Sequence, residues 1–372
     1  MKEKLVYIAP VRTIFPSTCA SSLHMIKMCD AYASLGYEVT LIVGASIDSQ
    51  ENILSFYNVN NSFKIKCIPT VKSKLGNITY ALKSSLYVKK IRPEKLLGRS
   101  VTSLSVLALL GAEVTIDMHG PATDLHFIDQ WLFKLANKNN NLNKITLNSN
   151  ALKNIMRSIS YIDDAKLVVA HNGSDQFDDY DFTGFESILK YNKGKINVGY
   201  FGSLYAGRGI ELIIDLANIN NNAVFHIFGG VDKEVDYWKS MCLSDNVFFY
   251  GHVSYKETFF YRDKCDALIA PYNPSGVTVS SNNKGDSSAY MNPIKLIEYL
   301  SAGKPILTSD IGVLKEILNK ESAFFCDYND IASWNDAVNK LVDADLVIKM
   351  GKSSLSKFNE GFTWKSRAEK LL

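Results

Sequence analysis

Residues 196–210 read INVGYFGSLYAGRGI, and this stretch decides the fold of the C-terminal half. Residues 196–201 are rich in β-forming side chains, Gly202 ends the predicted strand, and a helix is predicted over 209–218. A strand, a glycine-containing loop and a helix in this order predict one βα unit of a parallel sheet. Further strands are predicted at 223–228, 248–250 and 267–270.

The N-terminal half repeats this alternation of strands and helices. A strand at 5–9, a helix at 21–35 that ends at Gly36, and a strand at 38–43 predict a βαβ unit. Further strands are predicted at 63–69, 114–118, 144–147 and 166–170. The chain is therefore predicted to be α/β, with two Rossmann-like doubly wound domains facing a central cleft. The expected boundaries are an N-terminal domain at 1–177, a polar linker at 178–195, a C-terminal domain at 196–355, and a C-terminal helix at 356–372 that packs back on the N-terminal domain.

Composition excludes several classes of protein. With 372 residues, 47% of them hydrophobic, the chain can bury two cores and is not intrinsically disordered. A net charge of +3 is too balanced for a dedicated nucleic-acid-binding protein. The cysteines stand singly, which disfavours a zinc site and fits a reducing compartment, so a cytoplasmic protein is expected. No signal peptide or membrane-spanning segment is predicted, because the most apolar stretch, 101–116, is too short and polar to span.

Arg208 and the glycines around it form a candidate anion site. Glycines let backbone N–H groups approach an anion, a helix N-terminus adds its dipole, and a guanidinium matches phosphate oxygens. Gly202 to Gly207 has the spacing of a Walker loop, but Arg208 and Gly209 follow where that loop requires Lys and Ser or Thr. The ATPase class is therefore excluded. A tight strand-to-helix connection with an exposed arginine remains the alternative.

Residues 290–310, YMNPIKLIEYLSAGKPILTSD, predict a second helix N-terminus. Pro293 suits the first helical turn, Gly303 ends the helix, and a strand follows from Pro305. Glu298 lies close enough to the helix start to accept two hydroxyl hydrogen bonds from a ligand held at the amides of 293–296. An isolated glutamate on a helix more often faces solvent.

Taken together, these segments resemble the donor domain of glycosyltransferase family 4. In the C-terminal half the similar segments are YFGSLYAGRGI (200–210), FGG (228–230), YGHVSYKE (250–257), CDALIAPY (265–272) and NPIKLIEYLSAGKPILTSD (292–310). In the N-terminal half TIDMHGP (115–121), TLNSNALKNIM (146–156) and AHNGSD (170–175) are similar to landmarks of that family's acceptor domain. The segments occur in the family's order and cover nearly the whole chain. The resemblance implies a GT-B fold and a retaining nucleotide-sugar glycosyltransferase.

The resemblance also implies roles for individual residues. Arg208 and His119 would be catalytic, Arg208 by binding the donor diphosphate and His119 by lying against the donor sugar, and Glu298 would hold the ribose. A single histidine at the end of a strand is otherwise more often structural. The expected diphosphate-binding residues are Gly202, Ser203, Arg208, Pro293, Ile294, Lys295 and Leu296; those bordering the nucleobase are Gly229, His252 and Val253; those at the donor sugar are His119, Tyr290 and Asn292.

Two positions depart from the family pattern. Tyr290 stands where many members carry a carboxylate that contacts the donor sugar, and Ser203 stands where they carry a basic residue. Asp286 could substitute for the missing carboxylate and Lys295 for the missing cation. The polar neighbours of Asp286 also fit a solvated loop; they are Ser280, Asn282, Asn283 and Ser287.

The predicted reaction is transfer of a hexose from a UDP- or GDP-linked donor, with retention, to a lipid-linked or oligosaccharide acceptor. Such an enzyme would serve bacterial surface polysaccharide synthesis, as in lipopolysaccharide or capsule. Because Arg208 and the helix N-terminus would neutralise the leaving diphosphate, no metal or cofactor is expected beside the nucleotide sugar. Two alternatives remain: a catalytically silent protein that binds a nucleotide sugar or glycan, and a nucleotide-sugar epimerase.

The stretch from Lys64 to Arg99 is strongly basic. Its other cations are Lys66, Lys72, Lys74, Lys83, Lys89, Lys90, Arg92 and Lys95, against Glu94 as its single acid. Apolar residues are interspersed: Leu82, Leu86, Tyr87, Val88, Ile91, Leu96 and Leu97. The pattern predicts a peripheral face for the anionic inner surface of the cytoplasmic membrane, with a solvated helix face as the alternative.

Overall fold

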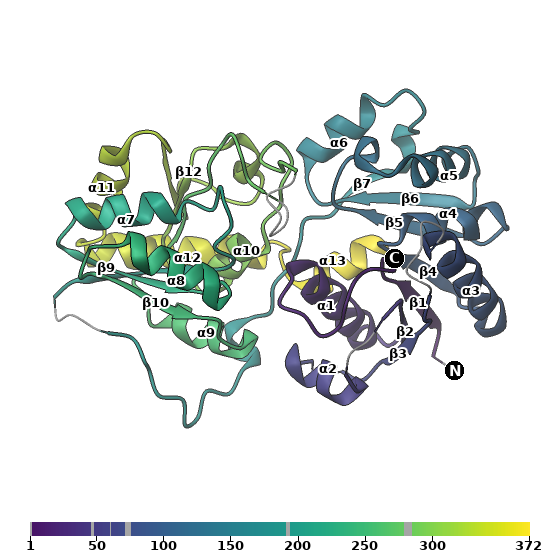
Figure 1. Ribbon diagram of the computed structural model, residues 1–372, viewed down its shortest axis with the longest axis horizontal. Helices are drawn as coiled ribbons and strands as arrows, with labels where there is room; N and C mark the ends of the chain where they lie inside the picture. The colour runs from purple at the N-terminus through teal and green to yellow at the C-terminus, as the bar shows by residue number, and fades with distance from the viewer. Residues whose placement is uncertain (1, 46–47, 60, 71–75, 191–193, 279–284) are drawn as a thin grey trace. The chain divides into compact units, whose positions relative to one another are not determined.

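The chain folds into two compact units, which we describe separately. The computed structural model describes residues 2–45, 48–59, 61–70, 76–190, 194–278 and 285–372. Unit 1 comprises Met1–Asn172 and Trp364–Leu372, and unit 2 comprises Gly173–Thr363 (Figure 1). Residues 178–195, which the sequence suggests as a linker, thus fall within unit 2. The last helix of the chain belongs to unit 1 and begins at Trp364 rather than at residue 356.

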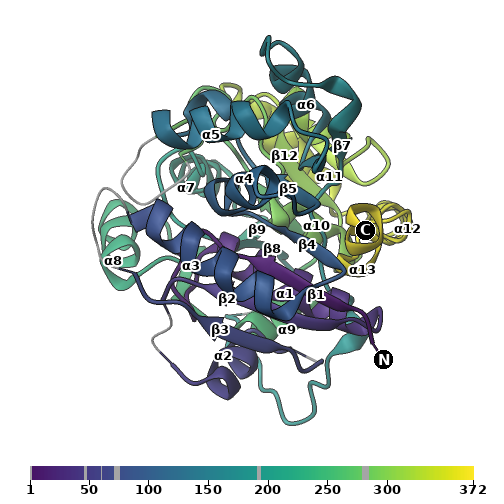
Figure 2. The same ribbon diagram turned by 90° about the vertical axis from the view of Figure 1, so that its right-hand side faces the viewer.

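Unit 1 is built on a parallel sheet with the strand order β3-β2-β1-β4-β5-β6-β7. Its strands are β1 (Lys4–Ile8), β2 (Glu38–Val43), β3 (Lys64–Cys67), β4 (Lys95–Gly98), β5 (Val114–Met118), β6 (Leu142–Leu147) and β7 (Leu167–Val169). Its helices are α1 (Ala20–Ser34), α2 (Gln50–Phe56), α3 (Gly76–Ile91), α4 (Val101–Leu109), α5 (Phe127–Asn137), α6 (Asn150–Arg157) and α13 (Trp364–Leu371). Helices α3, α4 and α5 pack against one another in that order, and α13 packs against α1 (Figures 1 and 2).

Unit 2 contains a second parallel sheet, with the strand order β10-β9-β8-β11-β12-β13. Its strands are β8 (Ile196–Phe201), β9 (Ala223–Phe228), β10 (Val247–Gly251), β11 (Ala267–Ala270), β12 (Ile306–Ser309) and β13 (Ala323–Cys326). Its helices are α7 (Ile210–Ile219), α8 (Asp232–Met241), α9 (Tyr255–Asp263), α10 (Ile294–Ser301), α11 (Ile331–Lys340) and α12 (Ala344–Asn359). Short 3₁₀ turns occur in both units: η1 (Ala122–Asp124), η2 (Asp164–Lys166), η3 (Phe177–Asp179) and η4 (Gly312–Glu316).

The predicted α/β class is confirmed, and both units are doubly wound. The direction of winding reverses between β1 and β4 in unit 1 and between β8 and β11 in unit 2. In open α/β sheets, ligands bind outside the carboxyl ends of the strands at such a reversal. The topology therefore directs the search for a site to these two points. None of the described helices has the length and apolar character that crossing a bilayer requires.

The basic stretch from Lys64 to Arg99 is only partly a surface helix. It contains β3, α3 and β4. Val88, Leu96 and Leu97 are buried in the core of unit 1, so the expectation that they belong to an amphipathic surface is wrong. Strand β4 is central in the sheet, which explains why its leucines face inward. Leu82 and Leu86 of α3 are exposed, whereas Lys72 and Lys74 lie outside the described residues.

Candidate functional site

The carboxyl ends of β8 and β11 bring together the two segments that the sequence singles out. The loop after β8 carries Gly202 and Arg208, and α10 begins shortly after the loop that follows β11. A Cβ atom added to Gly202 would lie 2.8 Å from Nζ of Lys295. Lys295 Nζ and Arg208 Cζ lie 5.3 and 5.6 Å from the centre of the Tyr272 ring. The predicted phosphate loop and the predicted helix start thus meet at the reversal point of unit 2.

Lys295 is a buried cation without an anionic partner in the described structure. Its Nζ atom is enclosed and makes no hydrogen bond to a described residue. It lies 3.9 Å from the centre of the Tyr200 ring, a cation–π distance. Burial, reinforced by the charge of Arg208, lowers the pKa of Lys295 well below its ordinary value. A cation in this position is unfavourable for the fold alone and is suited to receive an anion.

Arg208 is held rigidly and keeps an unused donor. Its Nη2 donates to the carbonyl oxygen of Thr278 at 3.0 Å, and the Thr278 hydroxyl donates to the Ala206 carbonyl at 3.1 Å. The Nε–H group of Arg208 is buried without an acceptor among the described residues. No carboxylate within the described ranges forms an ion pair with Arg208 or Lys295. Two adjacent cations with free donors offer the charge and the hydrogen-bond donors that binding a diphosphate requires.

Glycines close the strand ends next to these cations. Gly202 and Gly229 adopt φ angles of 146° and 112°, which favour glycine. A Cβ atom on Gly229 would lie 2.1 Å from the Gly202 carbonyl oxygen. The Gly229 amide donates to the Gly251 carbonyl at 2.7 Å, and His252 and Val253 follow directly. The residues expected at the nucleobase therefore adjoin the loop that carries Arg208. Ser203 contributes to the loop through its carbonyl, which accepts the Tyr200 hydroxyl at 2.6 Å.

Glu298 is buried in α10 and forms an ion pair that the sequence analysis missed. Arg262 of α9 donates through Nη1 to Glu298 Oε2 at 2.7 Å, and the Arg262 guanidinium lies 4.2 Å from the centre of the Phe259 ring. The signal in the sequence is an arginine inside the aromatic run FFYRD (259–263). The described structure shows no hydrogen bond to Glu298 Oε1, so this oxygen remains available to a ligand hydroxyl.

The segment before α10 contains the residues expected at the donor sugar. Asn292 is buried and Tyr290 is half-buried, and Pro293, Ile294, Lys295 and Leu296 form the start of the helix. Asp286 is engaged in its own loop: its carboxylate accepts the amides of Val277 at 3.0 Å and Ser288 at 2.9 Å. These bonds give Asp286 a loop-closing role and lower its pKa despite partial burial. Its polar neighbours Ser280, Asn282 and Asn283 lie outside the described residues.

His119 belongs to unit 1, where it follows β5. Its Nε2 atom lies 3.3 Å from Oδ2 of Asp117, and its side chain is 14% exposed. His24, Asp117 and His119 place potential metal-ligand atoms within 4.8 Å of one another. However, Asp117 also pairs with Arg367 at 2.7 Å, so a guanidinium already neutralises the only carboxylate of this group. The arrangement is that of a buried ion-pair network.

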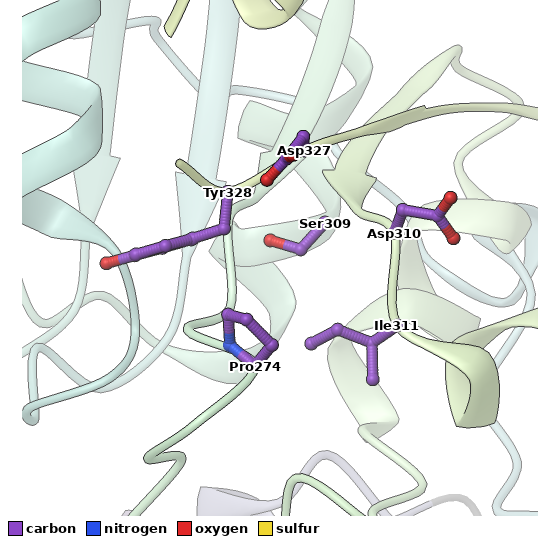
Figure 3. A pocket seen from close by; sticks show the side chains of 6 residues that line it. All are labelled: Pro274, Ser309, Asp310, Ile311, Asp327 and Tyr328. Carbon is purple, nitrogen blue, oxygen red and sulfur yellow. The ribbon is translucent and has the colours of Figure 1, made fainter. Parts of the chain in front are cut away.

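A separate cavity of about 260 Å³ lies beyond the carboxyl ends of β12 and β13 (Figure 3). It is lined by Pro274, Ser309, Asp310, Ile311, Asp327 and Tyr328. None of the residues expected at the donor is among them. Its charged lining groups are two carboxylates, one of them paired with Lys315 at 2.5 Å. A diphosphate would be repelled there, so we place the candidate site at the ends of β8 and β11.

The second unit is similar to one family of known proteins. Residues 183–354 match the family model of glycosyl transferases group 1, which leaves unit 1 outside the match. No curated protein matches the chain.

Solved structures share the whole fold. Anabaena Alr3699/HepE in complex with UDP is 14% identical, with a TM-score of 0.72 over 98% of this chain and 97% of the other. A glycosyltransferase from Rickettsia africae is 14% identical, with a TM-score of 0.73 over 99% and 96%. WaaG, a glycosyltransferase involved in lipopolysaccharide biosynthesis, is 11% identical, with a TM-score of 0.66 over 99% and 98%. At these identities the likeness establishes the fold. The chain thus has the GT-B fold, and residues 183–354 of its second unit match the model of glycosyl transferases group 1.

Proposed function

We propose that this protein transfers a sugar, with retention, from a nucleoside-diphosphate sugar to a glycan or lipid-linked acceptor. The observation that carries the proposal is the pair of cations Lys295 and Arg208 at the reversal point of unit 2, neither of which has an anionic partner among the described residues. A buried lysine without an acceptor costs stability, and a bound diphosphate would offset that cost. The group 1 match covers this site, which supports assignment to glycosyl transfer.

The cations would act on the leaving group. When the acceptor oxygen bonds to the anomeric carbon, the bond from that carbon to the phosphate oxygen breaks, and the diphosphate leaves with the electron pair. The departing phosphate takes the acceptor's proton, which balances the reaction without a separate base. Lys295 and Arg208 would stabilise the charge that develops on the diphosphate. Because these groups supply the positive charge, the proposed reaction needs no metal. His119 is proposed as the residue of unit 1 that contacts the donor sugar.

UDP is the proposed nucleotide. Alr3699/HepE has been solved with UDP and with UDP-glucose, and this chain shares its fold. Glu298 Oε1, available in α10, would accept ribose hydroxyls, while the backbone at Gly229 and His252 would border the base. A role in surface polysaccharide synthesis is supported by the likeness to WaaG.

The test is a panel of UDP- and GDP-sugars, incubated with and without glycan acceptors. A glycosyltransferase releases nucleoside diphosphate and extends the acceptor, an epimerase changes the sugar, and a silent binding protein does neither. Lys295→Met should abolish release, whereas Lys349→Met, an exposed lysine of α12, is the matched control. Release by Lys295→Met at the wild-type rate would contradict the proposed site.

We propose in addition that α3 contacts an anionic membrane. Leu82 and Leu86, one turn apart, are 53% and 72% exposed. Lys83, Lys89 and Lys90 are exposed on the same helix, so apolar and basic groups are combined as in peripheral membrane helices. Such contact would keep a cytoplasmic enzyme close to a lipid-linked acceptor.

Co-sedimentation with vesicles containing phosphatidylglycerol tests this contact. Replacing Leu82 and Leu86 with serine should reduce the bound fraction severalfold. Leu243→Ser is the control, since Leu243 is 95% exposed and lies in unit 2. Equal binding of all variants, or no binding by the wild type, would reject the membrane role while leaving the transferase proposal intact.

A further inference from the structure

Unit 1 contains a buried ion pair that joins its last helix to its fifth strand. Arg367 of α13 donates through Nη2 to Oδ1 of Asp117 at 2.7 Å, and both side chains are almost fully buried. Nη1 of Arg367 donates to the carbonyls of Ala170 and His171, just beyond β7. Thr146 of β6 donates its hydroxyl to the same Asp117 oxygen at 3.0 Å. Helix α13 thus supplies the positive charge that neutralises Asp117 at the carboxyl ends of β5 to β7.

Burial and the charges around this ion pair determine the protonation of His119. Burial alone would raise the pKa of Asp117, but Arg367 and the neighbouring histidines hold it well below its usual range. Asp117 is therefore a carboxylate and can only accept hydrogen bonds. Burial, aided by Arg99, lowers the pKa of His119 to about 4, so the imidazole is neutral at pH 7. A neutral ring facing a carboxylate through Nε2 carries its proton on Nε2, which leaves Nδ1 as an acceptor.

Helix α13 supports His119 by a second route. Trp364 packs edge-on against His24, with ring centres 5.4 Å apart. His24 packs edge-on against His119, with ring centres 4.6 Å apart. His24 is buried, neither of its ring nitrogens has a hydrogen-bond partner among the described residues, and burial lowers its pKa well below the ordinary value. His24 therefore lies between Trp364 of α13 and His119, and its Nε2 atom is 3.7 Å from Oδ2 of Asp117.

The charges nearby oppose the alternative of a metal at His24, Asp117 and His119. A divalent cation would share Asp117 with Arg367, and Arg99 also contributes positive potential there. One carboxylate would then face two guanidinium groups and a metal in a buried region, which is electrostatically unfavourable.

We propose that Arg367 is a positioning residue for His119: by keeping Asp117 ionised, it fixes the Nε2-protonated imidazole and leaves the Nδ1 lone pair to accept a hydrogen bond from a sugar hydroxyl. The hydrogen bond between His119 and a sugar rests on the proposed glycosyl transfer. The position of the proton on the His119 ring rests only on contacts within unit 1. The consequence is that residues 364–372 are required for the state of His119, although they are remote from it in sequence.

Nitrogen NMR of the full chain labelled at histidine tests the proposal without turnover. His119→Gln identifies the His119 signals. The wild type should show a neutral, Nε2-protonated ring at pH 7, and Arg367→Met should lose this pattern because Asp117 no longer has its counter-charge. A wild-type ring that is Nδ1-protonated or charged would overturn the proposal. So would a joint shift of the His24 and His119 signals on addition of Zn²⁺, which would indicate a metal site.

A double variant separates positioning from a merely structural role. Arg367→Met with Asp117→Asn removes both buried charges, so its unfolding midpoint should recover toward the wild type. Its kcat should remain at least about tenfold low, because His119 has lost its fixed tautomer, while the Kd for UDP stays unchanged. Recovery of kcat with stability would mean that the pair is only structural. The control is Arg157→Met with Asp164→Asn, a half-exposed pair of the same unit that should alter neither quantity. If the wild type transfers no sugar, the proposed function is wrong. The NMR experiment then still tests the proposed tautomer of His119.

Discussion

The Nζ atom of Lys295 lies 3.9 Å from the centre of the Tyr200 ring and has no hydrogen-bond acceptor among the described residues. Aromatic faces stabilise a cation by electrostatic attraction, but they do not replace a buried counter-ion. A lysine at this position therefore lowers the stability of unit 2 and favours the binding of an anion. Both effects can be measured in a variant that lacks the charge.

Lys295→Met should stabilise the protein and weaken donor binding. Methionine fills a similar volume without a charge, so the free energy of unfolding should rise by on the order of 1–3 kcal/mol. The Kd for UDP should increase about ten- to a hundredfold, the scale of one charged hydrogen bond. Chemical denaturation and calorimetric titration measure the two quantities. A destabilised variant that still binds UDP would show that Lys295 belongs to the core instead.

Binding of UDP should take up a proton at pH values above the lowered pKa of Lys295. The pKa of Lys295 is lowered in the free protein, and a bound diphosphate would raise it again. Between these two pKa values, the Kd should therefore increase as pH rises, by at most about tenfold per pH unit. Titration calorimetry in two buffers of different ionisation enthalpy measures the uptake, and Lys295→Met should eliminate it. Uptake of the same size in that variant would assign the proton to another group.

Arg208→Ala should lower kcat/KM by roughly ten- to a thousandfold, because it removes a charged hydrogen bond and stabilisation of the leaving group. Its Nη2 anchors the loop at Thr278, so Arg208→Lys, which keeps the charge but loses the fork, should recover only part of the activity. Steady-state assays with saturating acceptor measure both variants. Wild-type turnover in Arg208→Ala would remove this residue from the mechanism.

Glu298 needs a conservative substitution, because Arg262 depends on it. Glu298→Ala would leave a buried guanidinium unpaired and cost about 3–5 kcal/mol of stability. Glu298→Gln retains an acceptor for Arg262 and should fold, while the Kd for UDP increases about tenfold through weaker ribose contacts. An unchanged Kd in a folded Glu298→Gln variant would place the ribose elsewhere.

Gly202→Ala should displace Lys295. The added Cβ would lie 2.8 Å from Nζ, and the φ angle of 146° is unfavourable for alanine. We expect at least about tenfold weaker UDP binding, on the scale of one charged hydrogen bond. Gly276→Ala is the matched control, since a Cβ atom there meets nothing within 4 Å. Equal affinities of the two variants for UDP would show that the loop containing Gly202 does not take part in anion binding.

Most of the sheet of unit 2 was predictable because its strands are local patterns. The runs at 196–201, 223–228 and 267–270 appear as β8, β9 and β11 with the predicted bounds, and the helix predicted at 209–218 appears as α7, displaced by one residue. Strand β4 escaped prediction because its KLLG sequence lies inside a basic stretch that resembles a surface helix. Its burial between β1 and β5 is a property of the sheet rather than of four residues.

The amino-acid sequence by itself determined the α/β class, the alternation of strands and helices, and the residue types available to bind a diphosphate, since each depends on short-range spacing and side-chain chemistry. Only the tertiary structure decided which of those side chains keep a partner. Arg262 reaches Glu298 across 36 positions, and Arg367 reaches Asp117 across 250. The local periodicity of the sequence carries no information about contacts over such separations. These contacts form because the strand order of the sheet and the packing of the helices bring distant segments together. Burial then gives each ion pair, and the lack of one at Lys295, a large effect on the free energy of unfolding.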